Sequence, residues 1–181
     1  KYGGPRGAGF LLARRSPAPA PVLFGGGQER GIRPGTVDVA AAAAMAAALR
    51  EALAEREEEN TRIARLRDDL REQILARVEE VRVNTVEPAL PGHLHLSFPG
   101  ADGDSMIMLL DSLGIEASTG SACSAGVNRM SHVLEAMGVA PEEGIGSLRF
   151  TLGRGTTAAD VAYLAEHLGG VVERARSAGL R

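Results

Sequence analysis

The sequence predicts a mixed α/β fold, because strand and loop patterns rich in glycine and proline give way to amphipathic helix–strand units. The glycine- and proline-rich part is concentrated in residues 1–36 of the 181-residue chain. Apolar residues make up 44% of the chain and charged residues 24%, which is close to the average of a globular protein. This composition excludes a disordered, collagen-like or coiled-coil protein as a description of the whole chain.

Charge, hydropathy and cysteine content narrow the function classes. The net charge of −3 gives no reason to expect direct nucleic-acid binding. No apolar run approaches the roughly 18 residues of a membrane span, so no membrane partner is expected. The single cysteine, Cys123, excludes an intramolecular disulfide and is typical of a reducing, cytoplasmic setting. The chain begins at Lys1 with no signal-peptide pattern, which indicates a front end that has been cut or processed.

The first part of the chain is expected to form strand and loop. The apolar run Gly9–Ala13 lies between chain-breaking residues and predicts a buried strand. Alternating prolines over 17–21 predict an extended connector, and a glycine-rich loop follows over 24–36. We therefore expect one domain to end at residue 36, a connecting helix over 37–54 and a small α+β domain over 55–181.

Residues 37–79 have a helical composition. Thr36 or Asp38 can cap the first turn, and residues 40–53 are almost all Ala, Met and Leu, so this part is expected to be buried on most sides. Farther along, apolar residues recur every three or four positions, as in an amphipathic helix. Because forty residues is long for one globular helix, we expect a break near Asn60–Thr61.

The remainder alternates short strands and helices. Strands are expected where apolar and polar residues alternate, at 81–83, 93–98 and 147–152. Helices are expected where capping residues precede periodic apolar residues, at 102–113, 131–137 and 157–176. The first of these helices can be capped by Asp102 or Asp104 and ended by Gly114, and the last begins with a Thr-x-x-Asp pattern.

Cys123 is the first candidate for chemistry. Only small residues surround it over 118–126, with no amphipathic period, so this stretch is expected to be a mobile loop. A thiol on such a loop can act as a nucleophile that delivers a group to a partner. The alternative is a buried structural cysteine that packs as a small hydrophobic residue.

Arg149 and Lys1 are weaker candidates on local sequence alone. Arg149 shares a strand face with Thr151, and its guanidinium can bind a substrate carboxylate through two hydrogen bonds; the alternative is a solvated strand face. Lys1 opens a glycine-rich turn that can cradle a phosphate, or is simply solvated. His93 and His95 share a strand face, but no cysteine or carboxylate at ligand spacing accompanies them, so no intrinsic metal site is expected.

Four stretches together resemble the pyridoxal-phosphate cysteine desulfurases, the IscS/NifS group of aminotransferase class V. They read KYGGPRGAG, GGGQERGIRPGT, STGSACS and SLRFTLGR, at 1–9, 25–36, 118–124 and 147–154. The resemblance implies that residues 1–36 are the end of the large domain of a fold-type-I transferase. It also implies that the chain is the C-terminal half of such an enzyme and is inactive alone.

The resemblance also implies residue roles. Lys1 matches the lysine that holds pyridoxal 5'-phosphate as a Schiff base, and Cys123 matches the nucleophile that becomes a persulfide. Arg149 matches the arginine that binds the substrate carboxylate. Thr36 matches the threonine that, in the family's homodimer, reaches the cofactor phosphate of the other subunit. His95 stands where many members carry asparagine, and the resemblance assigns it no role.

The implied reaction converts L-cysteine to L-alanine and leaves a persulfide on Cys123. The implied sulfur acceptor is an iron–sulfur scaffold protein or a tRNA-thiolating enzyme, and Cys123 could transiently ligate an iron–sulfur cluster. Two alternatives stay open. One is a related pyridoxal-phosphate enzyme, such as a selenocysteine lyase or an epimerase; the other is an inactive truncated fragment that acts only in dimerisation or binding.

Overall fold

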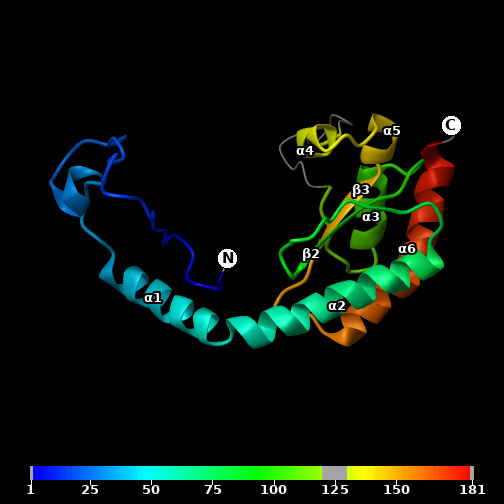
Figure 1. Cartoon of the computed structure of the whole chain (residues 1–181), viewed down its shortest axis with the longest axis horizontal. Helices are drawn as coiled ribbons and strands as arrows, with labels where there is room; N and C mark the ends of the chain where they lie inside the picture. Colours follow the sequence, from blue (N-terminus) through cyan, green and yellow to red (C-terminus); the bar gives the residue numbers. More distant parts are fainter. Residues whose placement is uncertain (1, 120–129, 180–181) are drawn as a thin grey trace. The chain divides into compact units, whose positions relative to one another are not determined.

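The structure, a computed structural model, describes residues 2–119 and 130–179 (Figure 1). The chain divides into two compact units, one ending at Glu57 and the other beginning at Glu58. The first unit contains the short 3-10 helix η1 (Gln28–Gly31) and the helix α1 (Val39–Ala54). The second unit contains a sheet and the remaining helices, and it carries Arg149.

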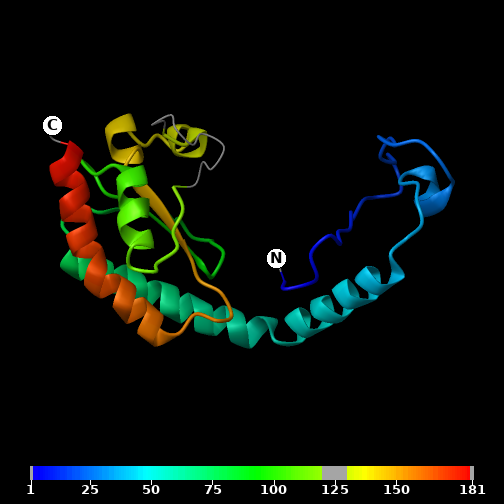
Figure 2. The ribbon, with the colours of Figure 1, turned by 180° about the vertical axis from the view of Figure 1, so that it is seen from behind.

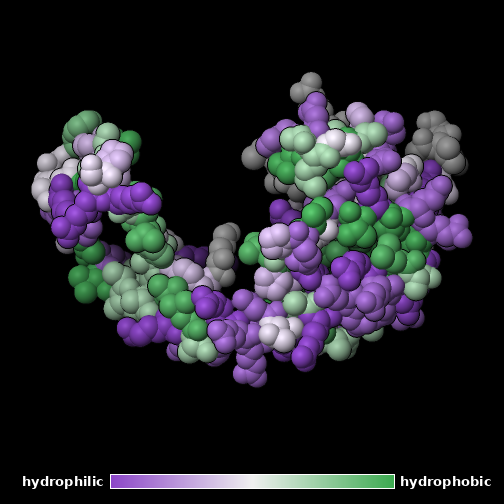
Figure 3. Space-filling view, in the orientation of Figure 1, coloured by the Kyte–Doolittle hydropathy of each residue, from purple (hydrophilic) through white to green (hydrophobic). Residues whose placement is uncertain are grey.

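The predicted strand at Gly9–Ala13 is absent, so that prediction is wrong. These residues form no regular structure, and Phe10, Leu11 and Leu12 are exposed. A strand needs a neighbour to accept and donate its backbone hydrogen bonds, and the described part of the first unit provides none. Apolar side chains consequently remain on the surface of this unit (Figure 3).

Asp38, rather than Thr36, caps helix α1, and its side chain accepts a hydrogen bond from the Ala41 N–H at 2.9 Å. The expectation that this Ala-rich helix is buried on most sides is wrong for this chain, because no described residue of α1 is buried. The described elements of the first unit are too few to cover a helix that is apolar on nearly every face. Its apolar surface is therefore only partly covered.

The helical stretch breaks at Glu55, which lies between α1 and α2 (Arg56–Arg77). The prediction of a break near Asn60–Thr61 is therefore wrong. Asn and Thr are weak helix formers, but α2 continues through them. Leu70 and Ile74 of the same helix are fully buried, and tertiary packing of an apolar face outweighs local propensity.

The second unit contains a three-stranded antiparallel sheet in the order β1 (Arg82–Val83), β2 (His93–Ser97), β3 (Ser147–Thr151). All three strands lie where the alternating pattern predicts them. Ser118 adds an isolated bridge to Arg149 at the outer edge of β3. The sheet thus brings the segment that leads toward Cys123 beside the strand that carries Arg149.

Helix-capping residues behave as the sequence predicts. Asp102 accepts from the Ser105 N–H at 2.8 Å and begins α3 (Gly103–Asp111). Thr157 and Asp160 bond reciprocally at the start of α6 (Ala158–Gly179). Between them lie two short helices, α4 (His132–Ala136) and α5 (Pro141–Gly144).

The core lies between one face of the sheet and the helices α2, α3 and α6. Figure 2 shows α3 and α6 together on this side of the sheet. The sheet contributes the apolar residues that alternate along its two longer strands: Leu94, Leu96, Leu148 and Phe150. Because every second side chain is used in this way, the opposite face keeps the polar residues. No helix among the described residues is long and apolar enough to cross a membrane.

Candidate functional site

The polar face of the sheet, defined by three cross-strand pairs, forms the candidate site. Its members are the residues of β2 and β3 that point away from the core: His93 opposite Thr151, His95 opposite Arg149, and Ser97 opposite Ser147. Directly opposed side chains in an antiparallel pair have Cβ atoms about 4.5–5.5 Å apart. The imidazole of His95 and the guanidinium of Arg149 are therefore immediate neighbours.

Both backbone hydrogen-bonding groups of Arg149 pair with Ser118. Its N–H donates to the Ser118 carbonyl at 2.6 Å, and its carbonyl accepts from the Ser118 N–H at 3.2 Å. Among the described residues, its guanidinium makes only a long contact of 3.5 Å, from Nη2 to the Ser118 hydroxyl. Arg149 Nε is buried and has no partner among the described residues. A buried, unbonded donor on a cation is costly, so this guanidinium is suited to receive an anionic ligand.

His95 is fixed by an unusually complete set of hydrogen bonds. Its backbone N–H donates to Thr85 Oγ1 at 2.8 Å, and its carbonyl accepts from the Asn84 N–H at 2.9 Å. The Asn84 side-chain Nδ2 lies 3.1 Å from His95 Nδ1 and donates to Ser97 Oγ at 2.7 Å. The buried Asn84 amide therefore orients the ring of His95.

The pKa of His95 is lowered, first by burial and second by the positive charge of Arg149. Both causes disfavour the imidazolium form. A neutral imidazole therefore stands beside Arg149 at neutral pH, and the local positive charge is that of the guanidinium alone.

The structure does not place the other three predicted site residues on the polar face of the sheet. Thr36 is exposed in the loop that leads to α1, in the first unit rather than the second. Lys1 and Cys123 lie outside the described residues. Of the loop expected at 118–126, the structure describes Ser118 and Thr119, and Ser118 is paired with Arg149. The structure therefore describes Arg149 and Thr36 among the four predicted functional residues.

Sequence reasoning missed Asn84 and left His95 without a role. Asn84 follows a two-residue strand and carries no local motif, so nothing in its neighbourhood signals that it is buried against a histidine eleven positions later. Only the pairing of the strands brings the two together. The role of Ser118 as backbone partner of Arg149 depends on the same pairing.

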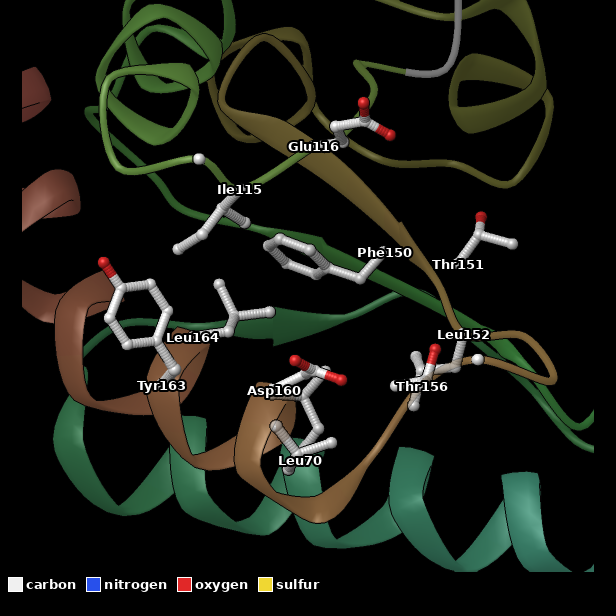
Figure 4. Close-up of a pocket in the computed structure, with 13 residues that line it drawn as sticks. Leu70, Ile115, Glu116, Phe150, Thr151, Leu152, Thr156, Asp160, Tyr163 and Leu164 are labelled. Atoms are coloured by element: carbon white, nitrogen blue, oxygen red, sulfur yellow. The ribbon is translucent and has the colours of Figure 1, made fainter.

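A separate pocket of about 460 Å³ lies at the outer edge of β3 (Figure 4). Figure 4 shows Phe150 and Leu164 beside it, with the carboxylates of Glu116 and Asp160 at different sides. None of the predicted site residues lines this pocket. Among the described residues, no group of three or more His, Cys, Asp or Glu is arranged to hold a metal ion.

Sequence relatives point to one enzyme group. The chain is 50% identical over 182 aligned positions to an IscS-like cysteine desulfurase of Mycobacterium tuberculosis, which covers 99% of this chain and 46% of the relative. It is 42% identical over 175 positions to a cysteine desulfurase IscS of Archaeoglobus fulgidus, covering 96% of this chain and 46% of the relative. The chain thus spans about half the length of the curated relatives it matches.

Solved structures agree with the sequence relatives. A NifS-like protein superposes with a TM-score of 0.81 at 29% identity, over 96% of this chain and 44% of the other. A NifS-like protein from Rickettsia africae gives a TM-score of 0.74 at 28% identity, over 85% and 40% of the two chains. These neighbours confirm the predicted fold class of a partial fold-type-I enzyme. The aminotransferase class-V pattern matches residues 1–164, and the chain therefore belongs to that family.

Proposed function

We propose that the complete protein containing this chain is a pyridoxal-phosphate-dependent cysteine desulfurase. The observation that carries the proposal is Arg149 Nε on the polar face of the sheet, which is buried and has no partner in the described part of the chain, beside the segment that leads to Cys123. A guanidinium with an open donor binds the carboxylate of an amino acid. The names of the 50%- and 42%-identical relatives support the same reaction.

Arg149 is proposed to orient the substrate. Its backbone is paired to Ser118 on one side and, as part of β3, to β2 on the other, so the guanidinium is presented from a rigid element. Fixing the α-carboxylate restricts the rotation of the amino acid and directs its Cβ–S bond toward one side. Such positioning lowers the entropic cost of reaching the reacting geometry.

The residue types of this chain fit the cofactor that the family implies. Lys1 would supply the amine that binds the cofactor covalently, and the exposed hydroxyl of Thr36 is a donor suited to a phosphate. When bound, pyridoxal 5'-phosphate supplies an electron sink for bond breaking at Cα. The amine of Lys1, once exchanged for the substrate amine, can hold and return a proton.

Cys123 is proposed to take the sulfur. Its thiolate attacks the sulfur of L-cysteine, so that an S–S bond forms and the substrate C–S bond breaks. A proton returned to the carbon completes L-alanine, and the sulfur stays on Cys123 as a persulfide. The reaction balances as L-cysteine plus enzyme thiol giving L-alanine plus enzyme persulfide. A sulfur-acceptor protein, of iron–sulfur cluster assembly or tRNA thiolation, would then receive the sulfur in the cytoplasm.

The complete protein is proposed to be a homodimer in which Thr36 approaches the partner's cofactor phosphate. The partly exposed apolar surface of α1 supports this arrangement, because an apolar helix with no fully buried residue is stabilised by a further surface that covers it. Residues 1–36 are proposed to belong to the large cofactor domain, residues 37–54 to the connecting helix and residues 55–181 to the small domain.

The test uses the complete protein loaded with pyridoxal 5'-phosphate. Cys123→Ser is expected to keep the visible absorbance of the bound cofactor and to lose sulfide release from L-cysteine, since a serine hydroxyl is a poor nucleophile toward sulfur. Lys1→Ala is expected to lose the covalent attachment of the cofactor. Ser124→Ala, next to the thiol, serves as the matched control and is expected to release sulfide at the normal rate.

Normal sulfide release by Cys123→Ser would refute the assignment. That result would favour a related pyridoxal-phosphate enzyme that does not use this thiol, such as a selenocysteine lyase. The appearance of L-alanine in equal amount to the sulfur transferred would support the balanced reaction written above.

A further inference from the structure

We propose that His95 binds the α-carboxylate of the amino-acid substrate together with Arg149, as a neutral hydrogen-bond donor whose ring is set by Asn84. The inference rests on the proposed function, in which Arg149 receives that carboxylate. It adds a second binding residue from the neighbouring strand and a specificity for substrates that carry a carboxylate.

The first observation is the strand register. His95 stands directly opposite Arg149 in the antiparallel pair of β2 and β3, on the polar face of the sheet. Directly opposed side chains on one face approach each other closely. A carboxylate has two oxygens with several lone pairs, so one held by Arg149 can accept a further hydrogen bond from the adjacent imidazole.

The second observation is the contact that decides which ring nitrogen carries the proton. Asn84 Nδ2 lies 3.1 Å from His95 Nδ1 and 2.7 Å from Ser97 Oγ. The amide nitrogen faces Nδ1, whereas the buried Asn84 Oδ1 has no partner among the described residues. In this orientation of the amide Nδ1 accepts, and a neutral imidazole then carries its proton on Nε2. Nε2–H becomes a donor at the free end of the ring, available to a ligand beside Arg149.

The third observation concerns charge. Arg149 and His93 are the other titratable groups on the polar face of β2 and β3. Burial and Arg149 lower the pKa of His95, which keeps a second positive charge away from the guanidinium. No acidic side chain of these two strands shares the face, so none of their residues competes with a substrate carboxylate for Arg149.

The buried Nε of Arg149 shows that hydrogen-bonding capacity on this face is unused by the described residues. His95, by contrast, has its backbone groups and Nδ1 already satisfied. Its remaining ring nitrogen is the part of the side chain that a ligand can use. If His95 had a purely structural role, it would only hold the side chains of Asn84 and Ser97 in place.

The experiment compares three variants of the complete, cofactor-loaded protein. His95→Leu is expected to raise KM for L-cysteine about 10-fold while kcat changes less than about 2-fold, because one hydrogen bond to a charged group is lost. His95→Gln retains an N–H donor and is expected to recover most of the loss. His167→Leu, on helix α6 and outside the candidate site, is the matched control and is expected to leave KM unchanged.

Binding measurements separate this inference from the proposed function. Calorimetry with L-alanine, which carries the carboxylate but no sulfur, is expected to show weakened binding in both His95→Leu and Arg149→Ala, whether or not the protein releases sulfide. Cysteamine, which lacks the carboxylate, is expected to bind His95→Leu and the unaltered protein equally. Unchanged L-alanine binding in His95→Leu would overturn the inference even if the protein is a desulfurase. Equal weakening for L-alanine and cysteamine would also overturn it, since that pattern indicates a structural role.

Discussion

Gly146 is a position where a single methyl group should disturb the strand that carries Arg149. A Cβ added there would lie 2.4 Å from the Phe98 carbonyl oxygen and 2.6 Å from the Ala101 carbonyl oxygen. Both neighbours are backbone atoms, which cannot rotate away as a side chain can. The Phe98 N–H donates to the Gly146 carbonyl at 2.9 Å, so moving the chains apart also strains that hydrogen bond.

The expected cost follows from these distances. Relief to ordinary contact requires a backbone shift of about 1 Å, and inserting an extra methyl group into a packed core costs roughly 1–3 kcal/mol. The clash involves two carbonyl oxygens and a hydrogen bond between the same segments. Gly146→Ala is therefore expected to lower the free energy of unfolding by about 3 kcal/mol, the upper end of this range. The destabilisation should be local to the start of β3 and the chain around Phe98.

Hydrogen–deuterium exchange of the complete protein measures this local effect. Amides of β3 are expected to exchange about 100-fold faster in Gly146→Ala, since each 1.4 kcal/mol corresponds to about a factor of ten. Gly153→Ala is the control, because no described atom beyond its two chain neighbours lies within 4 Å of the added methyl group. If β3 exchanged at the same rate in both variants, the clash would be absorbed without cost and the reasoning would be refuted.

Three further outcomes are expected from local contacts. Asp102→Ala removes the acceptor of the Ser105 N–H and should destabilise α3 by about 1 kcal/mol, measured as faster amide exchange in that helix. Hydrogen bonds from Thr157 lower the pKa of Asp160, so its stabilisation of α6 should be complete above about pH 4 and lost as the pH falls through the lowered pKa; Asp160→Asn should remove this acid dependence of exchange. The pKa of His95 is lowered as well, by burial and then Arg149. Stability should therefore decline as the pH falls below about 6.5 and level off beneath the lowered pKa. In acid titrations of unfolding, His95→Gln should abolish this slope.

Local sequence determined much of the second unit. Alternation of apolar and polar residues predicted the strands at 93–98 and 147–152 within one residue of their observed ends, because one face of each strand is buried. The helix caps formed by Asp102 and by Thr157 with Asp160 were also predicted from the sequence, because a cap depends on residues within one turn. The family membership also followed from sequence, because its four motifs are short and contiguous.

Tertiary structure alone decided which residues meet. The pattern places Arg149 on a polar strand face, but only the register of β2 against β3 puts His95 opposite it and Asn84 against the His95 ring. Packing also decides that the helix breaks at Glu55 and not near Asn60–Thr61, where the sequence predicts the break. The missing strand at Gly9–Ala13 has the same origin: a strand requires a partner from elsewhere in the chain, and strand pairing is a nonlocal choice that an alternating pattern does not specify.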